Sequence, residues 1–349
     1  NYAERYGSGI YVSGGELVIT GTDIISNTQP NLPVNRRGGG IFVANNTTLT
    51  MTHSLVANNP SEGGAGIYGG NNVNITLSDS TIEGNTAMNA ANFGFGGGIF
   101  SVSSLLIENS TISNNVAGTI GAGIRLGGGN TVMINSTVSG NQTAGSTGGI
   151  HVDASATANI SFSTIVSNTG TSGVEFLGTT IVSGSIIAYN TLDCAPGLLT
   201  DGGYNLDSDG SCGLAAGSSL PNTDPLLLPL ADNGGATATH WPLFASPVRD
   251  AVPTGVNGCG TTILYDQRGE PRPQGAGCDM GAVEAVPNSA PVAVADSFTA
   301  TEDITLTVAV PGVLLNDSDA EGQTLTAVPD TIPSQGTLDL ASSGAFTYT

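Results

Sequence analysis

The stretch GGIFSVSSLLIENSTISNN, residues 97–115, contains the unit from which the first half of the chain is built. A glycine pair leads into Ile99 and Phe100, and a short segment with apolar residues at alternate positions follows. The unit closes on the hexad STISNN, residues 110–115. Alternation of this kind is typical of a β-strand with one buried face. We therefore expect short strands separated by turns.

Copies of this unit recur along the first 190 residues of the sequence. A Gly followed by Ile or Val occurs at intervals of 24 to 32 residues, at Gly9, Gly40, Gly66, Gly98, Gly123, Gly149 and Gly173. The hexad keeps the same phase and ends on Asn27, Asn59, Asn85, Asn115, Asn141, Asn168 and Asn190. Repeats of this length without a helical period predict a parallel β-solenoid with one coil per unit. Residues 1–191 then form about seven coils.

The closing asparagine of each unit is expected at a corner of its coil. The backbone must turn sharply there, and Asn tolerates the left-handed region of φ/ψ. Stacked coils would bring these side chains to about 4.8 Å from one another. Their amides would then hydrogen-bond from coil to coil and satisfy a buried turn. The sequence therefore predicts a structural asparagine ladder, with glycine at the opposite corner.

This region resembles the right-handed parallel β-helices of the pectate-lyase-like superfamily, which includes polysaccharide-degrading enzymes and many non-catalytic bacterial surface proteins. The next segment, residues 192–284, contains DGGYNLDSDGSCGL (201–214) and DQRGEPRPQGAGCDMGAVE (266–284). It resembles the C-terminal part of the secreted bacterial "choice-of-anchor Q" β-helix proteins. The resemblance implies an all-β chain with further coils and a C-terminal cap, located outside the cell.

The four cysteines lie in two close pairs, Cys194 with Cys212 and Cys259 with Cys278. Neither pair has the spacing of zinc ligands. Two local disulfides formed in an oxidising compartment are the favoured interpretation, and the adjacent pairing is the one of three connectivities that the short loops favour. The charged segment 266–272 is interpreted as an arginine–carboxylate brace that locks the last coil.

Residues 285–291 form a linker by composition, and residues 292–349 alternate without hexads. Asp296, the pair 302–303 and the acidic stretch 316–321 match the cadherin-like or immunoglobulin-like modules of bacterial adhesins. The resemblance implies a β-sandwich module whose last strand is missing. The chain is interpreted as a fragment, or as the ordered part, of a longer secreted protein.

Calcium is the cofactor that this module suggests, because alternating oxygen ligands on a turn suit a hard cation. The candidate ligands are Glu302, Asp303, Asp317, Asp319 and Glu321. A solvated acidic turn is the alternative, and no organic cofactor is expected.

The net charge is −21, with 28 acidic residues against seven arginines and no lysine. Such a surface should repel nucleic acid, whose binding depends on cationic side chains, and also anionic membranes. No apolar run of about 18 residues is present, so no transmembrane segment is expected. No signal peptide is visible.

One residue of each coil offers a candidate ligand-binding surface. If the Ile after each glycine points inward, the next residue points outward, which gives a column of Tyr11, Phe42, Tyr68, Phe100, Arg125, His151 and Glu175. The column is either a sugar-binding strip or a cross-strand ladder that stabilises the sheet. Exposure of the rings decides between these interpretations.

Acids that could support catalysis are sparse in the coils. Asp23, Asp79 and Glu108 lie near the start of hexads in separated coils. The tight mixed cluster is Arg125, His151, Asp153 and Glu175, which could act as a general acid–base site but lacks the paired acids of a hydrolase. No catalytic residue is assigned.

The leading hypothesis is an extracellular bacterial surface protein with a structural or adhesive role, a stalk, adhesin or self-assembling fibre subunit. Its partners would be surface glycans, proteins or other copies of itself, contacted through a lateral face of the β-helix. The alternative is a polysaccharide lyase or glycoside hydrolase that acts on acidic polysaccharide. In that case Arg125, His151 and Glu175 should line a groove.

Overall fold

The computed structural model describes residues 6–28, 36–88, 94–286, 290–319 and 324–349. The chain divides into two compact units, residues 1–286 and residues 287–349. Glu321, one of the predicted calcium ligands, lies outside the described residues.

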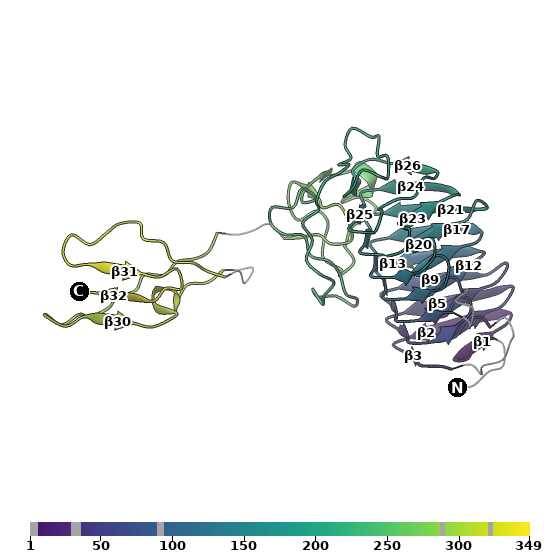
Figure 1. Ribbon diagram of the computed structural model, residues 1–349, viewed down its shortest axis with the longest axis horizontal. Coiled ribbons are helices and arrows are strands. Elements are labelled where there is room, and N and C mark those ends of the chain that lie inside the picture. Colours follow the sequence, from purple (N-terminus) through teal and green to yellow (C-terminus); the bar gives the residue numbers. More distant parts are fainter. Residues whose placement is uncertain (1–5, 29–35, 89–93, 287–289, 320–323) are drawn as a thin grey trace. The chain divides into compact units, whose positions relative to one another are not determined.

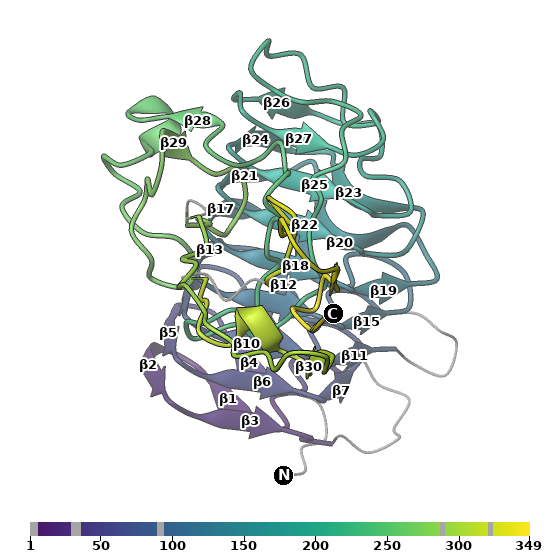
Figure 2. The same cartoon turned by 90° about the vertical axis from the view of Figure 1, so that its left-hand side faces the viewer.

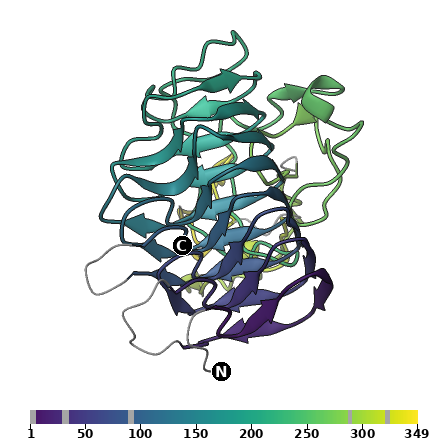
Figure 3. The same cartoon turned by 90° about the vertical axis from the view of Figure 1, so that its right-hand side faces the viewer.

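The first unit is a parallel β-solenoid, as predicted (Figure 1). Seven coils contribute a strand to each of three long sheets, and a further coil extends two of these sheets. Some coils add a short strand to a fourth sheet that the sequence did not predict. The coils stack from β1 upward along the solenoid, which Figure 3 shows from the side. The described residues contain no α-helix, and η1 and η2 are single 3₁₀ turns.

The first sheet follows the Gly-Ile positions. Its strands are β1 (Ile10–Val12), β4 (Ile41–Val43), β8 (Ile67–Gly69), β12 (Ile99–Ser101), β16 (Ile124–Leu126), β20 (Thr147–Val152) and β23 (Ser172–Phe176).

The second sheet contains the longest strands. They are β2 (Gly15–Thr20), β5 (Thr47–Thr52), β9 (Asn74–Ser78), β13 (Ser104–Glu108), β17 (Gly129–Ile134), β21 (Ala156–Ser161), β24 (Thr179–Ser183) and β26 (Leu199–Asp201).

The third sheet is made from the hexads. Its strands are β3 (Asp23–Ile25), β6 (Leu55–Ala57), β10 (Thr81–Glu83), β14 (Thr111–Ser113), β18 (Thr137–Ser139), β22 (Thr164–Val166), β25 (Ile186–Ala188) and β27 (Leu206–Asp207). The fourth sheet comprises β7 (Pro60–Ser61), β11 (Thr86–Ala87), β15 (Val116–Ala117) and β19 (Gln142–Thr143).

The register places equivalent residues of successive units beside one another. Ile82, for example, pairs with Val56 on one side and with Ile112 on the other. The inward residues of the three long sheets form one continuous buried core of Ile, Leu, Val and Met side chains. Burial of this apolar surface is the main force that holds the stack together.

The asparagine ladder runs through the buried corner that follows the third sheet. The backbone N–H and the side-chain Nδ2 of each ladder asparagine both donate to Oδ1 of the asparagine in the next coil, over 2.8–3.1 Å. The bonds between asparagines all run the same way along the solenoid, while Nδ2 also donates to a carbonyl of the preceding coil, as from Asn115 to Ile82 at 2.9 Å. The ladder ends where Asn190 donates to the carboxylate of Asp193, with Nδ2 3.0 Å from Oδ1. A carboxylate is the strongest acceptor available for such a chain of donors.

The expected left-handed conformation belongs to the residue before each ladder asparagine. Positive φ angles occur at Ser26, Asn58, Gly84, Asn114, Gly140, Ser167 and Tyr189, and not at the ladder positions. The prediction was therefore wrong by one residue. A left-handed residue reverses the backbone direction, so that the asparagine that follows it points into the solenoid instead of into solvent.

The glycine of each Gly-Ile pair is required by the ladder. A Cβ atom on Gly98 would lie 2.6 Å from the carbonyl oxygen of Gly123 and 2.9 Å from Nδ2 of Asn115. Equivalent contacts of 2.5 Å and 3.0 Å surround Gly66. These distances are below any normal carbon contact, so the ladder and the neighbouring coil leave no room for a side chain.

Residues 192–223 complete the last coil, and the disulfide between Cys194 and Cys212 lies there. Residues 224–286, which we call the strap, then return along the outer face of the third sheet (Figure 2). The strap contains β28 (Val252–Pro253), η1 (Val256–Gly258), β29 (Gly277–Cys278) and the second disulfide, between Cys259 and Cys278.

Gln267 attaches the strap to the third sheet. Its side chain is 1 % exposed; Nε2 donates to the hydroxyls of Thr111 (2.9 Å) and Thr237 (2.8 Å), while Oε1 accepts from Thr137 at 2.7 Å. Every polar atom of this buried amide therefore has a partner, as the cost of an unpaired buried polar group requires.

The charged segment 266–272 forms ion pairs inside the strap. Arg268 lies 2.7 Å from Asp266, and Arg272 lies 2.8 Å from Glu284. The guanidinium of Arg272 also stacks on the ring of Phe162, just before β22. The contacts of this segment with the solenoid, at Thr111, Thr137 and Phe162, lie on coils before the last one, which the sequence had suggested as the braced coil.

The second unit contains a three-stranded antiparallel sheet in the order β30 (Leu306–Val308), β32 (Phe346–Tyr348), β31 (Leu338–Leu340), and the turn η2 (Gly312–Leu314). Phe298 contacts Phe346 with ring centroids 4.9 Å apart. Among the described residues of this unit, only Gly312 and Gly344 are buried.

We predict that each ladder asparagine contributes strongly to the stability of the first unit. Asn115→Ala would leave the amide groups of Asn85 and the carbonyl of Ile82 without partners in a dry site. The expected loss is about 3–5 kcal/mol of the free energy of unfolding, since each unpaired buried group costs about 1–3 kcal/mol. Urea denaturation followed by circular dichroism measures it. The exposed Asn159→Ala is the control and should change stability by less than about 0.5 kcal/mol; equal effects would contradict the prediction.

A second prediction concerns pH. Burial raises the pKa of Asp279 to about 7, and the neighbouring Glu284 acts in the same direction. The folded protein therefore holds this proton more tightly than the unfolded chain does. The resulting stabilisation is complete below the ordinary pKa near 4 and disappears as the pH rises through about 7.

Asp279→Asn removes this titration. The free energy of unfolding of the wild type minus that of the variant should therefore fall by at most about 4 kcal/mol between pH 4 and pH 7, and stay constant above pH 7. Urea midpoints across this range provide the measurement. Glu16→Gln, at an exposed position, should parallel the wild type. A constant difference between wild type and Asp279→Asn would disprove the account.

Candidate functional site

The predicted outward column exists as a continuous row on the first sheet. The register pairs Tyr11 with Phe42, Phe42 with Tyr68, Tyr68 with Phe100, Phe100 with Arg125, Arg125 with His151 and His151 with Glu175. Its members differ in exposure. Tyr11 is 54 % exposed, whereas Tyr68, Phe100 and His151 are 6 %, 7 % and 2 % exposed. Most of the column is thus covered.

The rings of the column stack on one another. Phe42 and Tyr68 are parallel, with centroids 4.9 Å apart, and Tyr68 and Phe100 are 5.0 Å apart. Phe95 adds an edge contact to Phe100 at 4.9 Å, and Arg37 donates to the Tyr68 hydroxyl over 2.6 Å. Rings in such contact stabilise a sheet, and their faces are not free for a sugar. The geometry favours the interpretation as a cross-strand ladder.

The polar end of the column forms a chain of ion pairs. Arg125 lies 3.0 Å from Asp153, and the two ring nitrogens of His151 lie 2.8 Å from Asp153 and 3.1 Å from Glu175. The same carboxylate oxygen of Glu175 also accepts from the Ser146 hydroxyl at 2.9 Å. These four side chains therefore come together as the sequence suggested. Because both nitrogens of the buried imidazole are engaged, neither is available to a substrate.

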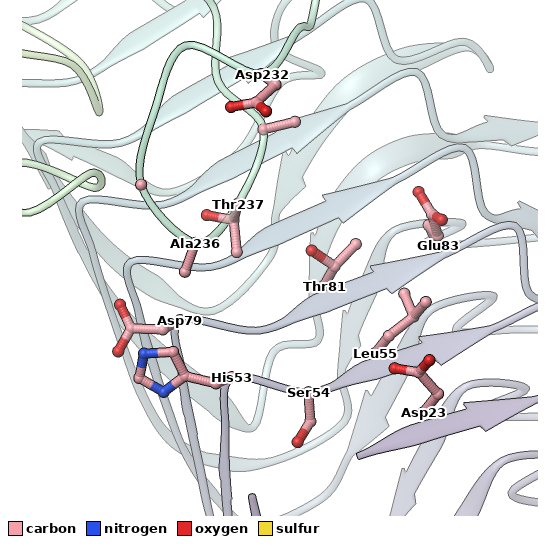
Figure 4. A pocket seen from close by; sticks show the side chains of 12 residues that line it. Asp23, His53, Ser54, Leu55, Asp79, Thr81, Glu83, Asp232, Ala236 and Thr237 are labelled. Atoms are coloured by element: carbon pink, nitrogen blue, oxygen red, sulfur yellow. The ribbon is translucent and has the colours of Figure 1, made fainter. Parts of the chain in front are cut away.

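An open groove lies elsewhere, on the third sheet beside the strap (Figure 4). Its volume is about 530 Å³. One wall consists of side chains from β3, β6 and β10 and the turns before them, and the other of the strap loop 232–238. The lining residues are Asp23, His53, Ser54, Leu55, Asp79, Thr81, Glu83, Asp232, Gly235, Ala236, Thr237 and Ala238.

The groove is strongly acidic. It is lined by the carboxylates of Asp23, Asp79, Glu83 and Asp232 and by no arginine. Within the described part of the chain, none of these four takes part in an ion pair. Asp232 accepts a hydrogen bond from the Gly234 N–H at 3.0 Å. Unpaired carboxylates on two facing walls produce a local negative potential that favours cationic or amine-bearing partners.

The local fold explains how these side chains reach the groove. His53 and Asp79 occupy equivalent positions just before adjacent hexads, both with left-handed φ angles of 47° and 49°. Asp23 begins β3 and Glu83 ends β10, both on the outer face of the third sheet. The strap loop is held by Thr237, whose hydroxyl donates to the carbonyl of Asn109 at 3.0 Å.

Sequence reasoning identified only part of this groove. It placed Asp23 and Asp79 near the start of hexads, but in separated coils; the structure shows one coil between them, with His53 in that coil. Asp232 and Thr237 were missed, because nothing in the sequence shows where residues so far along the chain fold back. Arg125, His151 and Glu175 are not among the residues that line the groove.

Four of the five predicted calcium ligands, Glu302, Asp303, Asp317 and Asp319, lie among the described residues. In the described parts of the chain, no group of three or more His, Cys, Asp or Glu side chains is placed to hold a metal ion. Asp317 instead accepts a hydrogen bond from the Val294 N–H at 2.8 Å. Calcium binding therefore stays a prediction.

Comparison with known proteins gives two matches. Residues 8–192, more than half of the chain, match the model described as the right-handed beta helix region, and residues 288–349 match that of the bacterial cadherin-like domain. No curated protein and no solved structure matches the chain. Among the described residues, no helix is long and apolar enough to cross a membrane.

We predict that the column acts mainly as a structural ladder. Tyr68→Ala should lower the free energy of unfolding by about 3–5 kcal/mol, the usual cost of removing a buried aromatic ring. Tyr11→Ala, at the exposed end of the same column, should cost less than about 1 kcal/mol. Urea denaturation compares the two variants. Similar small losses for both would show that the rings contribute little to the fold and would restore the sugar-binding interpretation.

Proposed function

Since the chain belongs to the right-handed β-helix family, we propose that it is a bacterial surface protein with a structural or adhesive role. The β-helix provides a rigid body, and the acidic groove on its third sheet makes the contact. The partner is a glycan or protein surface that carries amino groups. The cadherin-like domain, residues 288–349, belongs to a type of module that suits this role.

The location outside the cell is part of the proposal. Two disulfides support it, because such bonds form and persist in oxidising compartments. The bacterial cadherin-like domain agrees with it. The resemblance of residues 192–284 to the "choice-of-anchor Q" proteins, which are secreted, adds to the same proposal.

The observation that carries the proposal is the set of unpaired carboxylates in the groove. The inward residues of the solenoid pack in the core or form the ladder, and the charged residues of the column pair with one another. Asp23, Asp79 and Glu83 have no such structural partner in the described residues. Charged groups without partners in an open groove are suited to recognition, since complementary charge raises association rates and specificity.

The alternative, a polysaccharide lyase or hydrolase, gains no support from the site. Arg125, His151 and Glu175 should then line a groove, and none of the three lines the acidic groove described above. An acidic polysaccharide would also be repelled by the groove carboxylates.

Neutralising the groove should abolish adhesion without unfolding the protein. The variant combines Asp23→Asn, Asp79→Asn and Glu83→Gln. Beads coated with each protein are passed in low-salt buffer over a cationic amino-sugar polymer and over a neutral glucan. Wild-type beads should be retained on the cationic polymer, and the variant should be retained at least about tenfold less, because it loses three charges at the contact.

The matched control, Glu16→Gln with Glu108→Gln and Glu270→Gln, removes the same charge outside the groove and should behave as wild type. If both variants lose retention on the cationic polymer equally, the net charge of the protein and not the groove explains adhesion. Failure of the wild type to adhere to either polymer would remove the proposal.

Electron microscopy of the same preparations tests self-assembly. If only isolated monomers are seen at high protein concentration, the protein does not assemble into fibres.

A further inference from the structure

His240 lies between the strap and the third sheet and takes no part in the ladder, the column or the groove. It is 7 % exposed. Its Nε2 lies 2.9 Å from the Ser139 hydroxyl of β18, and its Nδ1 lies 2.8 Å from the Leu228 carbonyl oxygen of the strap. The imidazole therefore joins residues 225–241 of the strap, which we call its arm, to the sheet beneath, beside the hydrogen bonds of Thr237 to Asn109 and of Thr111 to Ala238.

The two contacts define the proton on the ring. A carbonyl oxygen only accepts hydrogen bonds, so Nδ1 must carry the hydrogen that it donates to Leu228. Nε2 of the neutral ring is then bare and accepts the hydroxyl hydrogen of Ser139. A second proton would have to enter at Nε2, where that hydroxyl hydrogen already points. Ser139 would have to turn away, and its hydrogen would need another acceptor in a buried place.

In the described part of the chain, no acidic side chain forms an ion pair with His240, in contrast to His151. On β18 its contact is the neutral Ser139, and on the strap it is a backbone carbonyl. The strap also carries Arg268, which stacks on the adjacent Trp241 and pairs with Asp266, and Asp232 in the groove loop. A buried cation without a counter-charge is strongly unfavourable.

We propose that the arm of the strap, residues 225–241, is a pH-operated latch that leaves the third sheet when His240 takes up a second proton. The arm includes the loop 232–238, so its release removes one wall of the acidic groove. Because the latch regulates the groove, its biological role rests on the proposed function. The pH-dependent release of the arm does not depend on that function. The rest of the strap stays seated through the Ala282 N–H, which donates to the Thr164 hydroxyl at 3.0 Å, and through the Tyr265 carbonyl, which accepts from Asn135 at 2.7 Å.

The direction of the pH dependence follows from burial. Desolvation lowers the pKa of His240, and the hydrogen bond to Leu228 opposes it in part. The seated arm therefore excludes a proton that the released arm accepts. Seating is fully stable above the ordinary histidine pKa of about 6.5 and weakens as the pH falls from there to the lowered value of the seated state. In this interval the equilibrium constant for release should rise about tenfold per pH unit.

Hydrogen exchange of residues 225–241 in the full chain tests the latch. After correction for the intrinsic pH dependence of exchange, wild-type exchange should be constant above about pH 6.5 and then accelerate about tenfold per unit as the pH falls. His240→Gln keeps an amide that donates to Leu228 but does not titrate, so its corrected exchange should not depend on pH. The control Glu16→Gln, at an exposed position outside the groove, should keep the wild-type slope.

Constant wild-type exchange across this range, or the same slope in His240→Gln, would overturn the proposal. If the variant fails to fold, the ring protons of wild-type His240 provide a second reading by NMR. A pKa of His240 at or above the ordinary histidine value would also overturn the proposal. Failure of the latch is distinguishable from failure of the adhesive function, because adhesion of the wild type at pH 7.5 does not depend on release.

Discussion

The asparagine ladder and the glycine column beside it form one constraint on which the rest of the solenoid depends. Each asparagine fills its site only because the facing residue has no side chain, and each glycine is required because the amide lies against it. The hydrogen bonds between asparagines run in one direction and end on Asp193. A coil that shifted by one residue would break both features at once, so the ladder fixes the register that brings the outer side chains into rows.

This constraint determines where function can reside. The interior is occupied by apolar side chains and by the ladder, so only the outer faces are available for recognition. On the first sheet the outer row is used mainly for stacking and ion pairs. On the third sheet the strap covers β14, β18 and β22, whereas β3, β6 and β10 border the groove. The groove therefore exists because the strap does not extend over the whole sheet.

Much of the fold was predictable from the sequence, because the repeat is local information. The interval between Gly-Ile pairs and the phase of the hexads were sufficient to predict the coils, the ladder asparagines and the outward row. The left-handed position was placed one residue late, since Asn occupies both places in copies such as Asn114-Asn115 and the sequence does not distinguish them. The short fourth sheet was not predicted, because a two-residue strand is too short to show an alternation of apolar and polar residues.

The site was harder to predict, because it depends on contacts between distant segments. Gln267, His240 and Thr237 look unremarkable in the sequence, and their roles appear only when the strap lies on the hexad strands. Burial was equally invisible: Tyr68 and Tyr11 occupy equivalent positions in the repeat, yet one is covered and the other is not. A single sequence gives the period of a solenoid but not the course of a segment that leaves the repeat.

Carboxylate footprinting on the bound protein tests the central claim most directly. The protein is labelled with a carbodiimide and glycine ethyl ester, free and while attached to an amine-bearing surface, and the labelled residues are mapped by mass spectrometry. The account predicts that Asp23, Asp79, Glu83 and Asp232 become protected on attachment, while Glu16 and Glu270 do not. Unchanged labelling of the groove, with protection at Asp153 and Glu175 instead, would contradict it.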